Sequence, residues 1–257
     1  MATARKSHSS ASIRKVLRLL AWCVLLAGTA HGQPQQPQPG TLADAINEVR
    51  RGNFAYVQQI VRIAGAEQAI PVLQDLFAHG ADADTKGWIA SELVKLGDKD
   101  DIYWDLLMKQ AREVVESDAP DFLNFDAQGK ASDGPSPEFV AWAKAHNFAL
   151  ESVAYEAVYP IKLGLLARTE DSRAIPLLRR GLLAPNHMVE AVAADGLAIL
   201  KDKDSIPLIV EACKRAPAEA ASAIAMSLLQ FHDPEAQRAA EPYLSGQLVD
   251  ALHQGKQ

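Results

Sequence analysis

Cysteine is nearly absent from this chain, which has two cysteines, Cys23 and Cys213, in 257 residues. Cys23 lies in an N-terminal apolar run that we expect to be removed, and a single remaining cysteine cannot form an intramolecular disulfide bond. Cys213 lies at helical spacing from Ile206 and Ile209, so we expect its thiol to be buried rather than reactive. Disulfide-stabilised folds are therefore excluded for the processed chain.

Motifs of catalysis and of metal binding are also lacking. No Gly-x-Ser-x-Gly sequence and no Gly-rich phosphate loop is present. None of the histidines after residue 32 has a second ligand at the spacing of a zinc motif such as His-Glu-x-x-His. The one local group of possible ligands, residues 79–84 (HGADAD), is explained by a turn followed by a helix cap. We expect no metal ion and no other cofactor.

Long hydrophobic runs are few, and the one at the N-terminus is too short to span a bilayer. Residues 19–27 (LLAWCVLLA) form an apolar core, preceded by five basic and no acidic residues. This order is typical of a secretory signal peptide, which we assign to residues 1–32 with cleavage after Gly32 or, alternatively, after Ala30. An uncleaved N-terminal anchor is the other possibility. We expect an exported protein, periplasmic or extracellular, with no stable membrane span after cleavage.

Positive charge becomes scarce once residues 1–32 are removed. That segment holds five of the 26 Lys and Arg residues and none of the 32 Asp and Glu residues, which leaves 21 basic and 32 acidic residues and a net charge of −11. Such a surface repels the phosphates of nucleic acids and the anionic headgroups of lipids. We therefore expect a protein or peptide partner and no nucleic acid.

What the chain does contain is a repeated phrase. Residues 69–73 (AIPVL) recur as residues 174–178 (AIPLL) and 205–209 (SIPLI), and Pro176 and Pro207 lie 31 residues apart. Self-similarity at a period of about 20 to 50 residues is typical of helical solenoids, in which each unit buries its apolar face against its neighbours. A proline in the first helical turn removes no intrahelical hydrogen bond, so we expect the phrase to mark helix starts.

A second phrase lies between the expected units. Residues 96–102 (LGDKDDI) match residues 200–206 (LKDKDSI) at five of seven positions, and residues 231–236 form a looser copy. We interpret the aspartates as caps of the following helices. A calcium site is the alternative, but no Gly-containing loop with a terminal Glu follows these residues.

Together the two phrases divide the chain into about six helix pairs. After a Pro/Gln-rich linker at residues 33–40, the units are 41–65, 68–97, 101–168, 172–201, 204–231 and an incomplete terminal unit at 234–254. The third unit is too long because it contains an insertion, about residues 117–137, that is rich in Pro, Gly, Ser and Asp. Long excursions of this kind are often functional or disordered. Its aromatic residues either pack the insertion onto the repeats or line a groove for a partner, and the sequence leaves both open.

The second helix of the fourth unit carries a nameable pattern. Val189, Ala193, Ala194, Leu197 and Leu200 follow the order Val-x-x-x-Ala-Ala-x-x-Leu-x-x-Leu. With the Ala-Ile-Pro-Leu-Leu opening, this resembles HEAT-like repeats of the bilin-lyase type. The resemblance implies an all-α fold, a right-handed α-solenoid of about six HEAT-like helix pairs with an insertion in the third. This chain departs from the family's pattern at Glu190, where many such repeats carry Arg.

Two functions follow from these features. The repeat surface, the missing catalytic motifs and the acidic charge favour a non-catalytic interaction or scaffolding module of the cell envelope that binds a protein or peptide. The alternative implied by the resemblance is a bilin-lyase-like enzyme or chromophore-handling protein, for which no residue here carries over as catalytic. The candidate partner-binding residues are Trp88 and Glu92 on a second helix, and Phe125, Trp142 and Tyr155 in and after the insertion.

Overall fold

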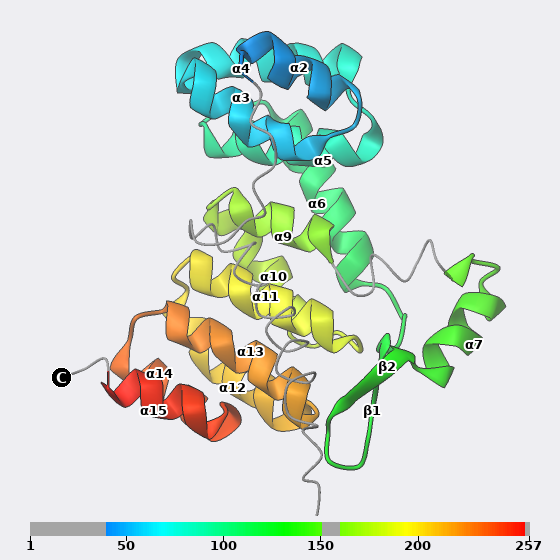
Figure 1. Ribbon diagram of the computed structural model, residues 1–257, viewed down its shortest axis with the longest axis vertical. Helices are drawn as coiled ribbons and strands as arrows, with labels where there is room; N and C mark the ends of the chain where they lie inside the picture. The colour runs from blue at the N-terminus through cyan, green and yellow to red at the C-terminus, as the bar shows by residue number, and fades with distance from the viewer. Residues whose placement is uncertain (1–39, 151–159, 255–257) are drawn as a thin grey trace, which may run out of the picture. The chain divides into compact units, whose positions relative to one another are not determined.

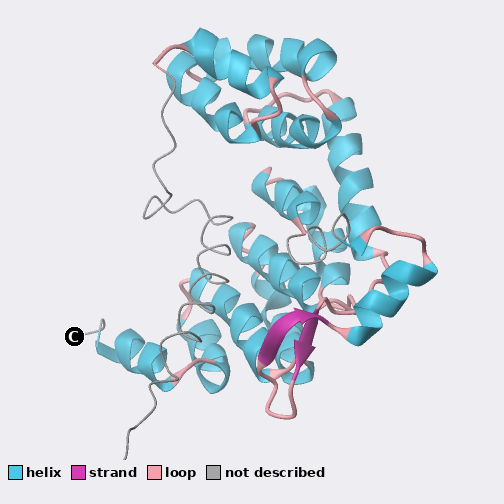
Figure 2. Cartoon of the chain, turned by 45° about the vertical axis from the view of Figure 1, so that its right-hand side comes forward, coloured by secondary structure: helices cyan, strands magenta, loops and turns pink. Residues whose placement is uncertain are grey.

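The computed structural model of this chain describes residues 40–150 and 160–254, which belong to one compact unit, Pro37–Gln257. The expected signal peptide and all but the last residue of the expected linker lie outside the described residues. The described part is mostly helical, with one two-stranded sheet, so the all-α class is confirmed (Figure 2). Within these ranges no helix is both long and apolar enough to cross a bilayer.

The helices of the described residues follow one another closely along the chain. Helices before the insertion are α2 (Leu42–Arg50), α3 (Val57–Ala64), α4 (Ala66–Asp75), α5 (Ala83–Lys95) and α6 (Asp101–Val115). The insertion leads into α7 (Pro137–Ala145). The remaining helices are α9 (Ile161–Arg168), α10 (Ile175–Gly181), α11 (His187–Ile199), α12 (Ile206–Arg215), α13 (Ala218–Gln230), α14 (Pro234–Ala240) and α15 (Gly246–Gln254).

Successive helices form antiparallel pairs whose second members lie side by side. Helices α5, α9, α11 and α13 pack against one another in this order, and α9, α11 and α13 each pack also against a first helix, α6, α10 and α12 respectively (Figure 1). The core lies between the two rows. Its fully buried side chains on the second helices include Ile89, Leu93, Leu163, Leu166, Leu197, Ile224 and Leu228.

Helix α11 lies at the centre of this packing. It is buried along Met188–Ala198 because α9 and α13 flank it and α10 covers a third side. Gly196 permits this close packing, since a Cβ at that position would lie 2.8 Å from Ala167 Cβ and 2.9 Å from Leu178 Cδ2. A larger residue would force α9 or α10 away from α11.

The Ile-Pro phrase starts two helices but not the third. Pro176 and Pro207 lie in the first turn of α10 and α12, as expected. The expectation for Pro71 is wrong, because α4 begins earlier, at Ala66, and Pro71 lies inside it. The cause is Gly65, whose φ of 76° ends α3 and lets α4 begin directly afterwards.

The aspartates between units have two roles, of which the sequence predicts one. Asp100 and Asp233 cap α6 and α14, and Asp82 caps α5, as expected. Asp202 makes no cap hydrogen bond and instead forms a 2.8 Å ion pair with Arg179 of α10. Asp98 likewise accepts a hydrogen bond from a first-helix side chain, Gln74 of α4. These carboxylates connect the two ends of one helix pair rather than start the next.

The insertion contains a β-hairpin, which the sequence analysis did not predict. Strands β1 (Leu123–Phe125) and β2 (Ala131–Pro135) pair antiparallel. Between them Asp126 Oδ1 accepts hydrogen bonds from the amides of Gln128 and Lys130, both at 2.9 Å, and Gly129 has a φ of 72°. The strands are too short to show an alternating pattern, whereas the Asp-x-x-Gly turn was a readable signal.

Candidate functional site

The predicted partner-binding residues fall in separate places. Trp88 and Glu92 lie one turn apart on α5. Phe125 ends β1, and Trp142 lies on α7. Tyr155 lies outside the described residues. The structure therefore does not bring the four described residues together, and the two regions, on α5 and in the insertion, have different surroundings.

The first region is an aromatic ledge, which we define as Phe54, Gln58, Trp88, Glu92 and Arg168 and call the Trp88 ledge. The rings of Phe54 and Trp88 stack at 4.8 Å with an interplanar angle of 7°. The guanidinium of Arg168, from α9, lies 5.3 Å from the centre of the Trp88 ring. Phe54 is 37% exposed, so the outer face of this stack reaches solvent. Three elements distant in sequence thus supply one partly exposed aromatic surface and a mostly buried arginine packed against it.

Glu92 belongs to the ledge but does not reach its accessible face. The Glu92 side chain is buried. Its Oε1 accepts a 3.1 Å hydrogen bond from Gln58, and a guanidinium nitrogen of Arg168 lies 3.7 Å from the same oxygen. A carboxylate held in this way has little capacity left for a partner. Glu92 therefore positions Arg168 over the indole ring, and because the Arg168 side chain is itself only 13% exposed, Phe54 and Trp88 provide most of the accessible surface.

In the insertion, the predicted aromatic residues make internal contacts. Trp142 donates a 2.8 Å hydrogen bond from Nε1 to Asp118 and packs on the fully buried Phe139. Phe125 contacts the imidazole of His187 edge to face, with the ring centres 6.0 Å apart. Both contacts attach the insertion to itself or to α11, which supports the packing role for these two residues.

Next to Phe125 lies a group of charged residues that we call the insertion anchor: Asp121, His187, Glu190 and Arg215. His187 lies between two carboxylates, with Nε2 3.3 Å from Asp121 Oδ2 and Nδ1 2.6 Å from Glu190 Oε2. Arg215 of α12 lies 3.0 Å from the other oxygen of Glu190. The anchor thus joins the start of the insertion to α11 and α12.

Two groups of the anchor have raised pKa values. Burial raises the pKa of the Asp121 carboxyl to about 6. Burial alone would lower the pKa of His187, but its hydrogen bond with Glu190 and the charge of Asp121 outweigh burial and raise it. A neutral imidazole has a single N–H and satisfies one carboxylate, so two carboxylates require either an imidazolium or a protonated Asp121.

A thiol lies on α12, the helix that supplies Arg215. Cys213, on the same helix as Arg215, is 1% exposed, and burial raises its pKa to about 12. The thiol therefore stays protonated, and the expectation of a buried, unreactive cysteine is confirmed. The sequence analysis missed the anchor because Asp121 and His187 are 66 residues apart, and the only local signal was a His three residues before Glu190.

A second set of contacts, two hydrogen bonds, holds the tip of the hairpin against α13. The amide of Ala131 donates to Glu219 Oε2 at 2.9 Å, and the amide of Glu219 donates to the carbonyl of Gly129 at 3.0 Å. A Cβ on Gly129 would collide with the backbone nitrogen of Ala218. Glycine is therefore required at this position for two reasons, its positive φ and this close approach. The insertion is thus fixed at its start and at its tip.

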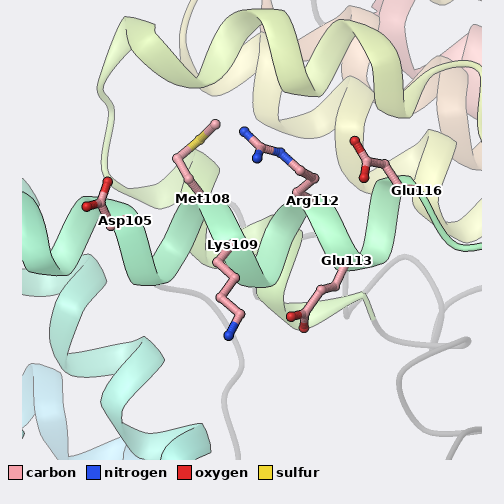
Figure 3. A pocket seen from close by; sticks show the side chains of 6 residues that line it. All are labelled: Asp105, Met108, Lys109, Arg112, Glu113 and Glu116. Carbon is pink, nitrogen blue, oxygen red and sulfur yellow. The ribbon is translucent and has the colours of Figure 1, made fainter.

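Two surface hollows complete the candidate sites. One, of about 320 Å³, lies along α6 and is lined by Asp105, Met108, Lys109, Arg112, Glu113 and Glu116. Figure 3 shows Met108 and Arg112 on one side of the helix and Lys109 and Glu113 on the other, without convergence on a common point. The second hollow, of about 280 Å³, lies between the end of α10 and α12.

Neither the anchor nor the hollows form a metal site. Within residues 40–150 and 160–254 no group of three or more His, Cys, Asp or Glu side chains is placed to hold a metal ion. Comparison with protein-family models, curated proteins and solved structures found no match to this chain.

Proposed function

We propose that this protein is an exported α-solenoid of HEAT-like helix pairs that binds a protein or peptide without catalysis. The side-by-side order of α5, α9, α11 and α13 supports the solenoid, since each second helix packs on the next, as repeat proteins require. The signal-like residues 1–32 support export to the periplasm or cell exterior.

The observation that carries the binding role is the Trp88 ledge. Trp and Arg are the residue types most enriched at binding hot spots, and here they are held in place before any partner arrives. Glu92 and Phe54 fix the two sides of the Arg168–Trp88 contact, so little side-chain entropy remains to be lost on binding. The insertion, held at its start by α11 and at its hairpin tip by α13, forms a fixed surface rather than a loose arm.

The test compares two tryptophans in matched surroundings. Trp88 and Trp104 are both half-buried, and each has an arginine over its ring, Arg168 at 5.3 Å and Arg173 at 4.2 Å. The full-length chain, Trp88→Ala and Trp104→Ala are each used to recover cross-linked partners from the native envelope, after circular dichroism has shown that all three are folded. We expect Trp88→Ala to lose a partner that Trp104→Ala retains. Equal recovery by both variants would show that the ledge is not the binding determinant.

A further inference from the structure

The hollow between α10 and α12 is apolar at its centre and basic at its rim. We call it the arginine–leucine groove. Its most exposed large apolar side chains are Leu183, 74% exposed, and Leu208, 45% exposed. Its volume of about 280 Å³ lies just below the range of about 300 to 1,000 Å³ that is usual for small-molecule sites, a size suited to one or two apolar side chains. The lining residues are Arg179, Arg180, Leu182, Leu183, Leu208, Glu211 and Arg215.

The arginines present their positive ends to solvent. Arg179 is paired with Asp202, and the side chains are 38% and 9% exposed respectively. Arg215 is paired with Glu190 in the same manner, and their side chains are 46% and 3% exposed respectively. In both pairs the carboxylate lies beneath the guanidinium, which has five N–H donors and so retains some that face outward.

Arg180 adds the third positive charge. It is 59% exposed and pairs with Glu116, which is itself 46% exposed and so only weakly held. The single carboxylate in the lining, Glu211, is occupied by Lys214 at 2.6 Å. The lining therefore holds three arginines and one carboxylate, and although each arginine has a carboxylate partner, the partners of Arg179 and Arg215 are nearly buried, so the charge exposed in the groove is mainly positive.

We propose that the arginine–leucine groove binds an acidic peptide segment that inserts a leucine-like side chain between Leu183 and Leu208 while its carboxylates pair with Arg179, Arg180 and Arg215. This deepens the proposed function and depends on it. Arginine suits such carboxylates because two of its N–H groups fit one carboxylate. An anionic bilayer offers the same charges, but the acidic remainder of the chain would oppose approach to an extended anionic surface, which favours a peptide.

The test is a random-peptide phage library selected on the full-length chain. Enriched peptides are synthesised, and their affinities for the wild type and for Leu183→Glu are measured by fluorescence anisotropy. The matched control is Ile102→Glu, since Ile102 is 53% exposed on α6, away from the groove lining. We expect peptides with net negative charge and at least one large apolar residue, bound about tenfold or more weakly by Leu183→Glu and unchanged by Ile102→Glu.

Several results would overturn the proposal. Enriched peptides that are basic or uncharged would contradict the charge argument, and unchanged affinity in Leu183→Glu would place binding elsewhere. Cosedimentation with phosphatidylglycerol vesicles, lost in Leu183→Glu, without any enriched peptide would assign the groove to membranes. Peptides that depend on Trp88 but not on Leu183 would leave the proposed function in place and remove the groove from it.

Discussion

At the scale of single residues, the positions that matter most are those where a small or charged side chain is the only one that fits. Gly129 and Gly196 allow close approach of α13 to the hairpin and of α9 to α11. Asp202 and Glu92 lie under arginines that they orient. These roles depend on contacts between residues far apart in the chain, and composition alone does not reveal them.

Gly129→Ala is expected to destabilise the fold by more than a positive φ alone explains. The control is Gly97→Ala, because Gly97 has a φ of 90° with no atom near its missing Cβ, whereas a Cβ on Gly129 would also strike Ala218. We expect Gly97→Ala to lower the free energy of unfolding by about 1 kcal/mol and Gly129→Ala by clearly more, measured by urea unfolding. Equal losses would mean that the hairpin tip can leave α13 at little cost.

At the scale of helices and strands, helices with periodic apolar residues and recognisable caps could be predicted from the sequence, whereas the hairpin in the insertion could not. Helices α10 and α12 begin where proline, with its fixed φ, favours a first turn. Asp100 and Asp233 are recognisable caps for the same local reason. The hairpin was missed because its stability comes from Glu219 and His187, which are supplied by α13 and α11.

The three Ile-Pro phrases provide an element-scale prediction, because all three prolines are exposed but only Pro71 lies beyond the first turn of its helix. Pro71→Ala restores an N–H that can donate to the carbonyl of Glu67, so we expect the free energy of unfolding to rise by about 1 kcal/mol or more. Pro207→Ala, in a first turn, should leave it unchanged or lower it by up to about 1 kcal/mol. Urea midpoints measure both, and a loss of stability in Pro71→Ala would contradict the assignment of the proline to the interior of α4.

The insertion anchor predicts that the hairpin is held more weakly as the pH rises. The pKa of Asp121 is raised by burial from 3.8 to about 6, and the pKa of His187 is raised above 6.5 by Glu190 and Asp121, against the opposing effect of its burial. A group whose pKa is higher in the folded state stabilises that state below its unfolded pKa and loses the contribution as the pH rises through the folded value. Both groups therefore act in the same direction, with the loss from Asp121 between about pH 4 and pH 6 and the loss from His187 continuing above pH 6.5.

Hydrogen exchange of the hairpin amides, corrected for the intrinsic effect of pH, measures this loss. We expect the free energy of opening at Ala131 to fall by about 1 kcal/mol between pH 6 and pH 8 in the wild type. In His187→Gln, whose amide donates at any pH, the fall should be smaller. Asp195, whose pKa burial raises to about 6, titrates in both proteins and cancels from the comparison. The same slope in both proteins would rule out the anchor as the source.

At the scale of the whole molecule, the all-α class was predictable because Ala- and Leu-rich segments with apolar residues three and four apart leave few other structures. The candidate site was predictable only in part. Trp88 lies on the ledge as an aromatic candidate should, whereas Glu92 is buried, and Phe125 and Trp142 serve the insertion's own packing. Exposure and pairing depend on tertiary contacts, which a single sequence does not contain.

Processing is the prediction that belongs to the whole chain. Export is expected to remove about thirty residues, so the N-terminus of the exported protein should lie between His31 and Gln35. Mass spectrometry of the protein recovered from the cell envelope measures this directly. A product that begins at Met1 and remains in the cytosol would reverse the assignment of residues 1–32.

The two attachments of the insertion, to α11 and to α13, affect the order in which the helices should unfold. In a stack where each helix pair touches only the next, the terminal pairs can fray one after another. Here the segment that follows α6 is bound to α11 through His187 and to α13 through Glu219. Because α13 cannot detach without releasing the hairpin that begins beside α6, the helices from α6 to α13 should melt as one cooperative block, and fraying should be confined to the pairs outside it.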